Sequence, residues 1–543
     1  MGEAHRRAAS RRGGPVALKD AWLLDERAEF ELYRPWLRPP RVRILMVTDD
    51  EGMFTKTHRF GLGEVVEALA DEPWWWVRFE VATAHRNGFP VGLTATNRDL
   101  AAFPGRPASP GKAALPAKPL HFDFKFWNDP RPELALSNFD EIWLFGIGGL
   151  SPALTTQEVD AIRAFMDAKA GVLAMGDHGP LGANLCSEIP RVKHMRKWKG
   201  GGPAGNPPPP FGPSRIDTLR EGATPGFQFP DQSDDVPQPI FPTRYSSWLN
   251  VNVLRRRWYP HPILCGIDGV IDVLPDHMHE GECVVAAPLP GTDFPGGIEP
   301  EVIATAEVLA HTTDNSSEGP FGVDVASTAR TFGILGAYDG HRPGADVGRI
   351  VVDATWHHWV HVNLRGFDPS SAAFAKIRNY YWNVALWLCP PALRASIFDT
   401  AVYGLPWLQP FDELRREPQS DLLQLGIEAM DALGRRAGQC MVSEWVDLVF
   451  IEFRIPLPFD RPARPFDPEV LQRVGATMLG GMVERAMQLA TDAAEAGHSA
   501  GRVASALREG ARDGLRRSLD LEARCQERRG ALLARLSKVA RRE

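Results

Sequence analysis

The sequence has few cysteines, and they lie far apart. Its 543 residues contain six cysteines, and no two of these form a CxxC pair. This spacing excludes a closed thiolate zinc site and a dense disulfide framework. We therefore expect a protein of a reducing compartment, in which most thiols behave as small buried hydrophobic side chains.

Long apolar runs and an excess of positive charge are also absent. No stretch approaches the ~18 uninterrupted apolar residues of a membrane-spanning helix, and no signal-peptide core follows the arginines of residues 1–15. The chain carries 61 Lys plus Arg against 68 Asp plus Glu, a formal net charge of -7. Without a chain-wide positive field, nucleic acid is not the expected partner. We expect a cytoplasmic protein with no membrane span.

The composition that remains is that of a globular protein. Hydrophobic residues make up 44% of the chain and charged residues 24%, values typical of folded soluble domains. The chain is longer than a single hydrophobic core usually supports. We expect one large domain and at least one smaller one.

Strand and helix patterns alternate in the first part of the chain. Short β-branched or apolar runs predict strands, and apolar residues at helical spacing predict helices between them. The predicted strands are 41–48, 76–83, 140–145, 172–175, 283–288, 302–309, 331–335 and 349–353, and the predicted helices include 60–69, one that begins near 154–158, and 374–388. This alternation is typical of an α/β protein with a mostly parallel sheet covered on both faces.

Changes in composition predict the domain boundaries. Residues 1–40 form an N-terminal extension, residues 41–390 the large domain, and residues 411–543 a mainly α-helical C-terminal region. Within the large domain, residues 200–243 are rich in Pro and Gly, which disfavour helix and central strand, and we expect a long insertion that covers the site as a lid.

Polar residues follow several of the predicted strands. In a parallel sheet the loops at the carboxyl ends of the strands form the crevice in which ligands bind. Asp49 and Asp50 follow the first strand and His85 the second, Asp177 and His178 follow the fourth, and His357 and His358 follow the last one. For Asp49, Asp50 and His85, ordinary turn chemistry is the more frequent explanation.

Asp177 lies in the most distinctive of these turns. Gly176 precedes it and Gly179 follows shortly after, and small residues permit a tight strand-to-helix turn that exposes a side chain at the edge of the sheet. Asp177 is suited to act as a base, a metal ligand or a nucleophile, and helix amides next to it suit a developing negative charge. The alternative is a helix N-cap.

Histidines gather in two segments. His277 and His279, followed by Glu280, share one face of an extended segment, as metal ligands two residues apart would. His357 and His358 follow the last strand. Imidazole with carboxylate is a ligand set for zinc, iron, nickel or manganese, although the HExxH motif is absent. A buried layer of His and Trp is the alternative for the second segment.

Three segments resemble the ThuA-like proteins of the class I glutamine amidotransferase-like superfamily. The strand and turn of 171–182 stand where the superfamily has its nucleophile elbow, His261 to Gly266 is similar to the family's HPI-x-x-G stretch, and 348–358 is similar to its GRV strand and terminal Gly-His. The resemblance spans most of residues 41–390. It implies a flavodoxin-like three-layer sandwich and a link to sugar metabolism.

The sequence departs from the superfamily at the elbow. Relatives that hydrolyse glutamine or peptides place Cys there, often as Cys-His-Gly, whereas this chain has Asp177, His178 and Gly179. Without a thiol there is no route to the usual thioester, so Cys-dependent glutaminase or protease activity is not expected. Cys186 lies further along, inside the helix that should follow.

Two hypotheses follow. The first is a hydrolase or carbohydrate-active enzyme that acts on a small molecule through Asp177, His178, His357 and His358, with a divalent metal held by His277, His279 and Glu280 as a further option. The second is a noncatalytic ligand-binding or scaffold protein whose C-terminal helices bind a protein partner or a second copy. The arginine-rich tail with spaced leucines, 505–542, suits helix pairing or an acidic surface, and a plain surface helix is the alternative.

Overall fold

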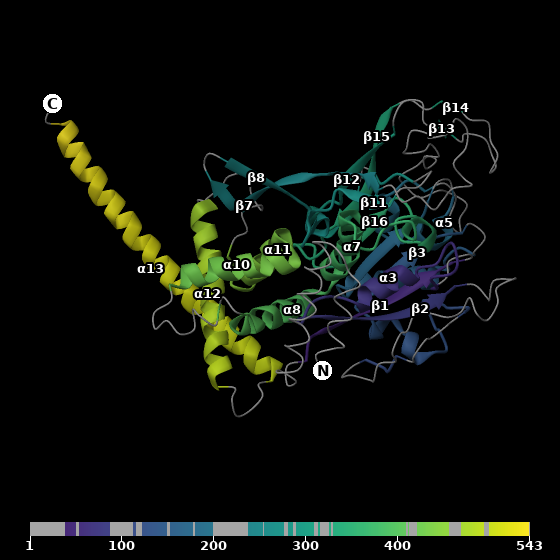
Figure 1. Ribbon diagram of the computed structural model, residues 1–543, viewed down its shortest axis with the longest axis horizontal. Coiled ribbons are helices and arrows are strands. Elements are labelled where there is room, and N and C mark those ends of the chain that lie inside the picture. Colours follow the sequence, from purple (N-terminus) through teal and green to yellow (C-terminus); the bar gives the residue numbers. More distant parts are fainter. Residues whose placement is uncertain are drawn as a thin grey trace.

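A mixed eight-stranded sheet and a helical C-terminal region make up the computed structural model (Figure 1). The structure describes residues 38–49, 54–86, 112–115, 122–148, 152–177, 180–198, 237–252, 255–275, 281–285, 289–308, 313–314, 325–326, 329–408, 411, 421–455, 468–492 and 499–541. Residues 1–37 of the predicted N-terminal extension and residues 200–236 of the predicted lid therefore lie outside the described residues. Among the described helices, none combines the length and apolar composition needed to cross a membrane.

The central sheet has the strand order β2-β1-β3-β4-β16-β15-β12-β6. The strands β2, β1, β3, β4 and β16 are parallel neighbours in that order. The strand bounds are β1 (Arg41–Thr48), β2 (Arg78–His85), β3 (Glu141–Phe145), β4 (Gly171–Met175), β6 (Phe241–Pro242), β12 (Glu301–Val308), β15 (Arg330–Tyr338) and β16 (Ile350–Asp353). The α/β prediction is thus confirmed, and the carboxyl ends of five strands meet at one edge.

The remaining three strands of the sheet are antiparallel, which the sequence patterns did not predict. β15 runs antiparallel to β16, β12 to β15 and β6 to β12. The connection from β15 to β16 has no crossover helix, and direct connections of this kind join antiparallel strands. Residues 283–285 form no strand, because Cys283 makes only isolated bridges, to Arg196 and Gly333.

The helices of the large domain match the sequence patterns. Thr155 caps α4 with a capping box to Glu158, as the hydroxyl and acidic residue at that spacing predict. α3 and α7 pack against each other and against strands of the sheet. The bounds are α3 (Gly63–Ala70), α4 (Thr156–Asp167), α5 (Ala183–Cys186), α6 (His361–Leu364) and α7 (Ala372–Leu388).

Short strand pairs and single helical turns fill the connections. The strand pairs are β5 (Pro237–Pro239) with β11 (Val273–Pro275), β7 (Arg244–Asn252) with β8 (Arg255–Pro260), β9 (Cys265–Gly266) with β10 (Gly269–Val270), and β13 (Thr313–Asp314) with β14 (Val325–Ala326). The 3-10 turns are η2 (Pro132–Leu134), η3 (Leu136–Asn138), η4 (Val192–His194), η5 (Pro262–Leu264), η6 (Pro295–Gly297) and η7 (Leu405–Trp407).

The C-terminal region, predicted as 411–543, is helical in its described residues, with α10 (Leu422–Ala437), α11 (Gln439–Glu452), α12 (Pro468–Asp492) and α13 (Ala500–Ala540). A further helix that the sequence did not predict, α8 (Pro391–Gly404), precedes it. α12 packs against α10 and α13, while α11 touches α8 and β9. In Figure 1 the far end of α13 projects away from the rest of the molecule.

A buried ionic network joins the sheet to these helices. Arg349, at the start of β16, donates from Nη1 and Nη2 to the two carboxylate oxygens of Glu444 on α11, at 2.9 and 2.8 Å, and from Nε to Asp339 at 2.7 Å. Arg394 on α8 adds a 3.3 Å contact to Glu444. Burial alone raises the pKa of Glu444, but the two arginines outweigh it and hold that pKa below its ordinary value.

Candidate functional site

Asp177 and His357 meet at the carboxyl ends of β4 and β16. Oδ2 of Asp177 lies 3.5 Å from Nε2 of His357. Oδ1 of Asp177 accepts a hydrogen bond of 2.8 Å from the hydroxyl of Thr355. β4 and β16 are adjacent parallel strands, so the register of the sheet brings these two distant stretches of chain together.

The side chains of this pair are buried. Asp177 is 0% exposed and His357 is 1% exposed. We expected the turn to expose a side chain at the edge of the sheet, and the structure instead covers the carboxylate. Asp177 is also not among the described non-glycine residues with positive φ, so the backbone there is not strained in that way.

Glycines make the turn around Asp177 possible. A Cβ on Gly176 would lie 2.4 Å from the carbonyl oxygen of Leu181, and Gly182 has a φ of +81° with the backbone of Gly146 and Gly176 close by. Larger side chains would clash there. The amide of Asp177 donates to the carbonyl of Leu181 at 3.1 Å, which closes the turn.

The imidazole of His357 is held on two sides. Its Nδ1 lies 2.8 Å from Oδ1 of Asn363. The ring of Trp356 stacks on it with centroids 3.8 Å apart, and Phe60 packs edge-on against Trp356. A ring fixed in this way keeps Nε2 directed at Asp177.

A buried arginine contacts the backbone of both strand ends that carry the pair. Nη2 of Arg196 donates to the carbonyl oxygens of Asp177 and of Ala354, the latter at 2.9 Å. Its guanidinium also packs over the ring of Trp198, 4.5 Å from the centroid. Burial lowers the pKa of Arg196, and the charge of Asp177 is among the groups that oppose this.

His358 is engaged by a different carboxylate. Its Nδ1 lies 2.8 Å from Oδ1 of Asp353, the last residue of β16. Oδ2 of Asp353 accepts from Nε1 of Trp359 and from the hydroxyl of Tyr380, each at 2.9 Å. This is a buried layer of His, Trp and Tyr, the alternative raised for this segment, and it lies against α7.

The ends of β1 and β2 carry separate polar contacts. Oδ1 of Asp49 accepts from the amides of Ile147 and Gly148 at 2.7 and 2.8 Å. Nδ1 of His85 lies 3.0 Å from the hydroxyl of Thr48, and burial lowers the pKa of His85 to about 4. Asp49 thus caps the turn after β3, which fits the ordinary turn chemistry favoured for it.

Several predicted residues lie outside the described residues. These are Asp50, His178, His277, His279 and Glu280. Within the part of the chain that the structure describes, no group of three or more His, Cys, Asp or Glu side chains is arranged to hold a metal ion. The predicted metal ligands therefore stay a prediction.

The sequence patterns did not assign roles to Thr355, Asn363, Arg196 and Asp353. Asp353 ends β16 and Thr355 follows it, both shortly before the predicted His357 and His358, and this position at a strand end was the available signal. Asn363 and Arg196 carry no such signal, because only the folded chain brings them to the site.

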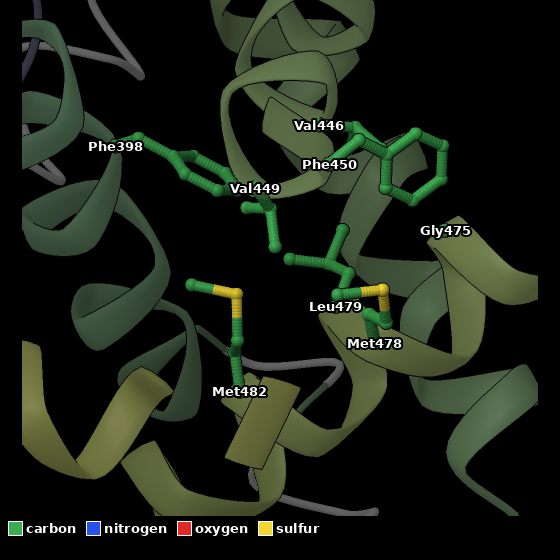
Figure 2. A pocket seen from close by; sticks show the side chains of 8 residues that line it. All are labelled: Phe398, Val446, Val449, Phe450, Gly475, Met478, Leu479 and Met482. Carbon is green, nitrogen blue, oxygen red and sulfur yellow. The ribbon is translucent and has the colours of Figure 1, made fainter. Parts of the chain in front are cut away.

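An apolar gap lies elsewhere, among α8, α11 and α12. Figure 2 shows the side chains that converge on it, and they leave no space for a water molecule between them. The lining residues are Phe398, Val446, Val449, Phe450, Gly475, Met478, Leu479 and Met482. With no ionisable side chain in its lining, this gap is a feature of helix packing.

Comparisons with known proteins give no relative for this chain. No protein-family model matches it, no curated protein matches it, and no solved structure matches it.

Proposed function

We propose that this chain is a ThuA-like hydrolase of a small molecule, a carbohydrate in the first instance, with Asp177 and His357 as the reacting pair. The 3.5 Å contact between their side chains carries the proposal. It lies at the strand ends where parallel sheets bind ligands.

The hydrogen bonds of His357 suggest how the pair would work. With Oδ1 of Asn363 as acceptor, the proton of the neutral ring lies on Nδ1. In the proposed mechanism, Nε2 of His357 and Oδ2 of Asp177 hold a second proton between them. That shared proton passes to the leaving-group oxygen as its bond breaks, and the pair recovers a proton from the attacking water.

The sheet supports a flavodoxin-like fold for this domain. Counted along the chain, the five parallel strands have the order 2-1-3-4-5, which is the flavodoxin-like order. The Asp177 turn follows the fourth of them and the His357 loop the fifth. These are the two segments that resemble the elbow and the terminal Gly-His of the ThuA-like family.

The test uses 4-nitrophenyl glycosides and esters as a substrate panel. We expect turnover of at least one by the wild-type chain and a loss of about 100-fold or more in Asp177→Asn, since a positioned general acid and base contributes on that order. Asp49→Asn is the matched control, because it changes a buried carboxylate that caps a turn. Elemental analysis of the same samples tests for a divalent metal. Equal rates in wild type and Asp177→Asn would refute the proposal.

Burial of the pair favours a second candidate, a noncatalytic scaffold. Asp177 and His357 are almost wholly covered, as side chains that only join β4 to the loop after β16 would be. In that case Asp177→Ala and His357→Ala would lower stability, and the wild-type chain would turn over no panel substrate and contain no metal.

A further inference from the structure

The exposed end of α13 continues a helix face that is buried further up the same helix. The buried residues of α13 all lie in its first half and follow one another at helical spacing; they are Val503, Leu507, Gly510, Ala511, Gly514 and Ser518. Steps of three and four residues lead from Ser518 to Leu521 and Cys525, and the same face continues to Leu532, Leu536 and Val539. Residues at these spacings share one face of a helix.

The buried half of this face packs closely on α12. A Cβ on Gly510 would lie 2.1 Å from the carbonyl oxygen of Gly481, and one on Gly514 would lie 2.3 Å from that of Thr477. Arg473, near the start of α12, bonds Glu522 at 2.8 Å. Since α12 begins at Pro468, it covers α13 only to about this point.

Beyond that point the apolar side chains are exposed. Leu521 is 50% exposed, Leu532 56%, Leu536 54% and Val539 64%. In Figure 1 this part of α13 stands clear of the other labelled elements. We call this row of apolar residues, Leu521, Leu532, Leu536 and Val539, the seam. A narrow apolar row of this kind is typical of helix pairing.

The charges beside the seam select the kind of partner. Residues 523–540 contain five basic side chains and one acidic side chain, Glu527. Arg528 lies three residues after Cys525 and four before Leu532, and Arg535 lies three residues after Leu532 and four before Val539, so both arginines lie on the same helix face as the apolar residues. A second copy of the chain would bring two positive segments together, which is unfavourable.

A membrane surface fits less well than a helix. Residues 519–541 contain no Trp, Phe or Tyr, whereas helices that lie in the membrane interface commonly use aromatic residues. The seam also extends a face that already packs on a helix. We propose that Leu521, Leu532, Leu536 and Val539, together with Arg528 and Arg535 on the same helix face, form a docking site for an acidic amphipathic helix of a protein partner.

The test measures binding of the full chain to two labelled synthetic helices by fluorescence anisotropy. One carries Leu at three- and four-residue spacing with Glu on the flanks, and the other has Lys in place of Glu. We expect the acidic helix to bind at least tenfold more tightly. Leu532→Glu should weaken that binding at least tenfold, whereas Ala534→Glu, with the same charge change on the opposite face, should weaken it less than threefold.

A charge exchange separates recognition from mere loss of structure. Arg528→Glu combined with Arg535→Glu should reverse the preference, so that the Lys helix binds more tightly than the Glu helix. Equal binding of both helices, or none, would overturn the proposal. So would self-association that Leu532→Glu abolishes, or tighter binding to phosphatidylserine vesicles than to the acidic helix.

Discussion

His85 shows how burial couples one residue to the pH dependence of stability. Its ring lies between Phe54 and Phe122, with centroid distances of 5.3 and 4.9 Å. Burial lowers its pKa to about 4, from an ordinary value of 6.5. The unfolded chain therefore binds more protons than the folded chain between these two pH values.

We predict that this difference costs stability as the pH falls. From about pH 6.5 to about pH 4, protonation of His85 in the unfolded chain should remove about 3 kcal/mol from the free energy of unfolding. The effect is absent above pH 7, where the ring is neutral in both states. Urea unfolding at several pH values should show that the free energy of unfolding falls by about 3 kcal/mol less across this range in His85→Gln than in the wild type. Identical slopes in the two proteins would contradict the prediction.

Single residues also mark the limit of what the sequence predicts. The position of Asp177 after a strand and of His357 after a later one could be read from the chain, because strand ends are recognisable and parallel strands share an edge. The residues that orient these two side chains could not be predicted from the sequence. Asn363 and Arg196 reach the site through a helical turn and a loop whose course has no periodic pattern.

At the scale of elements, buried helix faces depend on glycine where backbones approach closely. Gly510 faces Gly481 across the α12 and α13 contact, and neither position has room for a methyl group. A Cβ on Gly530, in the exposed part of the same helix, would meet no atom within 4 Å. The same residue type therefore has opposite effects on stability along one helix.

This pair gives a matched prediction. Gly510→Ala should lower the free energy of unfolding by about 1 to 3 kcal/mol, as overpacking of a tight contact does. Gly530→Ala should leave stability unchanged or raise it by up to about 1 kcal/mol, because alanine favours the helix. Urea denaturation of both variants checks this. A destabilisation by Gly530→Ala as large as that by Gly510→Ala would contradict it.

Elements with a strong local signal were predicted well. The first strand has the predicted bounds, Arg41–Thr48, and α7 begins two residues before its predicted start. α8 was not predicted, because Pro390 and Pro391 resemble a break, whereas Pro391 opens the helix at a position that tolerates proline. The antiparallel strands were not foreseen because apolar runs carry no information on strand direction.

At the scale of the whole molecule, the ionic network at Glu444 ties the helical region to the sheet. Arg349 and Glu444 are linked by two hydrogen bonds, and Arg349 also packs over Trp387 at 4.3 Å. Removing one partner of such a pair leaves a buried charge uncompensated. Asp431 and Arg435, by contrast, form a pair within exposed α10 surface.

We predict that Glu444→Gln lowers the free energy of unfolding by about 3 kcal/mol or more. Asp431→Asn should lower it by no more than about 0.5 kcal/mol, as exposed pairs within a helix do. Protease susceptibility of the helices should rise only in Glu444→Gln. If both variants unfold at the same denaturant concentration as the wild type, the network does not join the two parts.

The central claim is that Asp177 and His357 act as one unit, and a double-mutant cycle on the best panel substrate tests it most directly. Asp177→Asn, His357→Gln and the double variant would be compared with the wild type in kcat/KM, with folding confirmed by circular dichroism. Residues that share one proton should show losses of similar size, and the double variant should lose little more than either single variant. Losses that multiply, or single variants that retain the wild-type rate, would contradict the account.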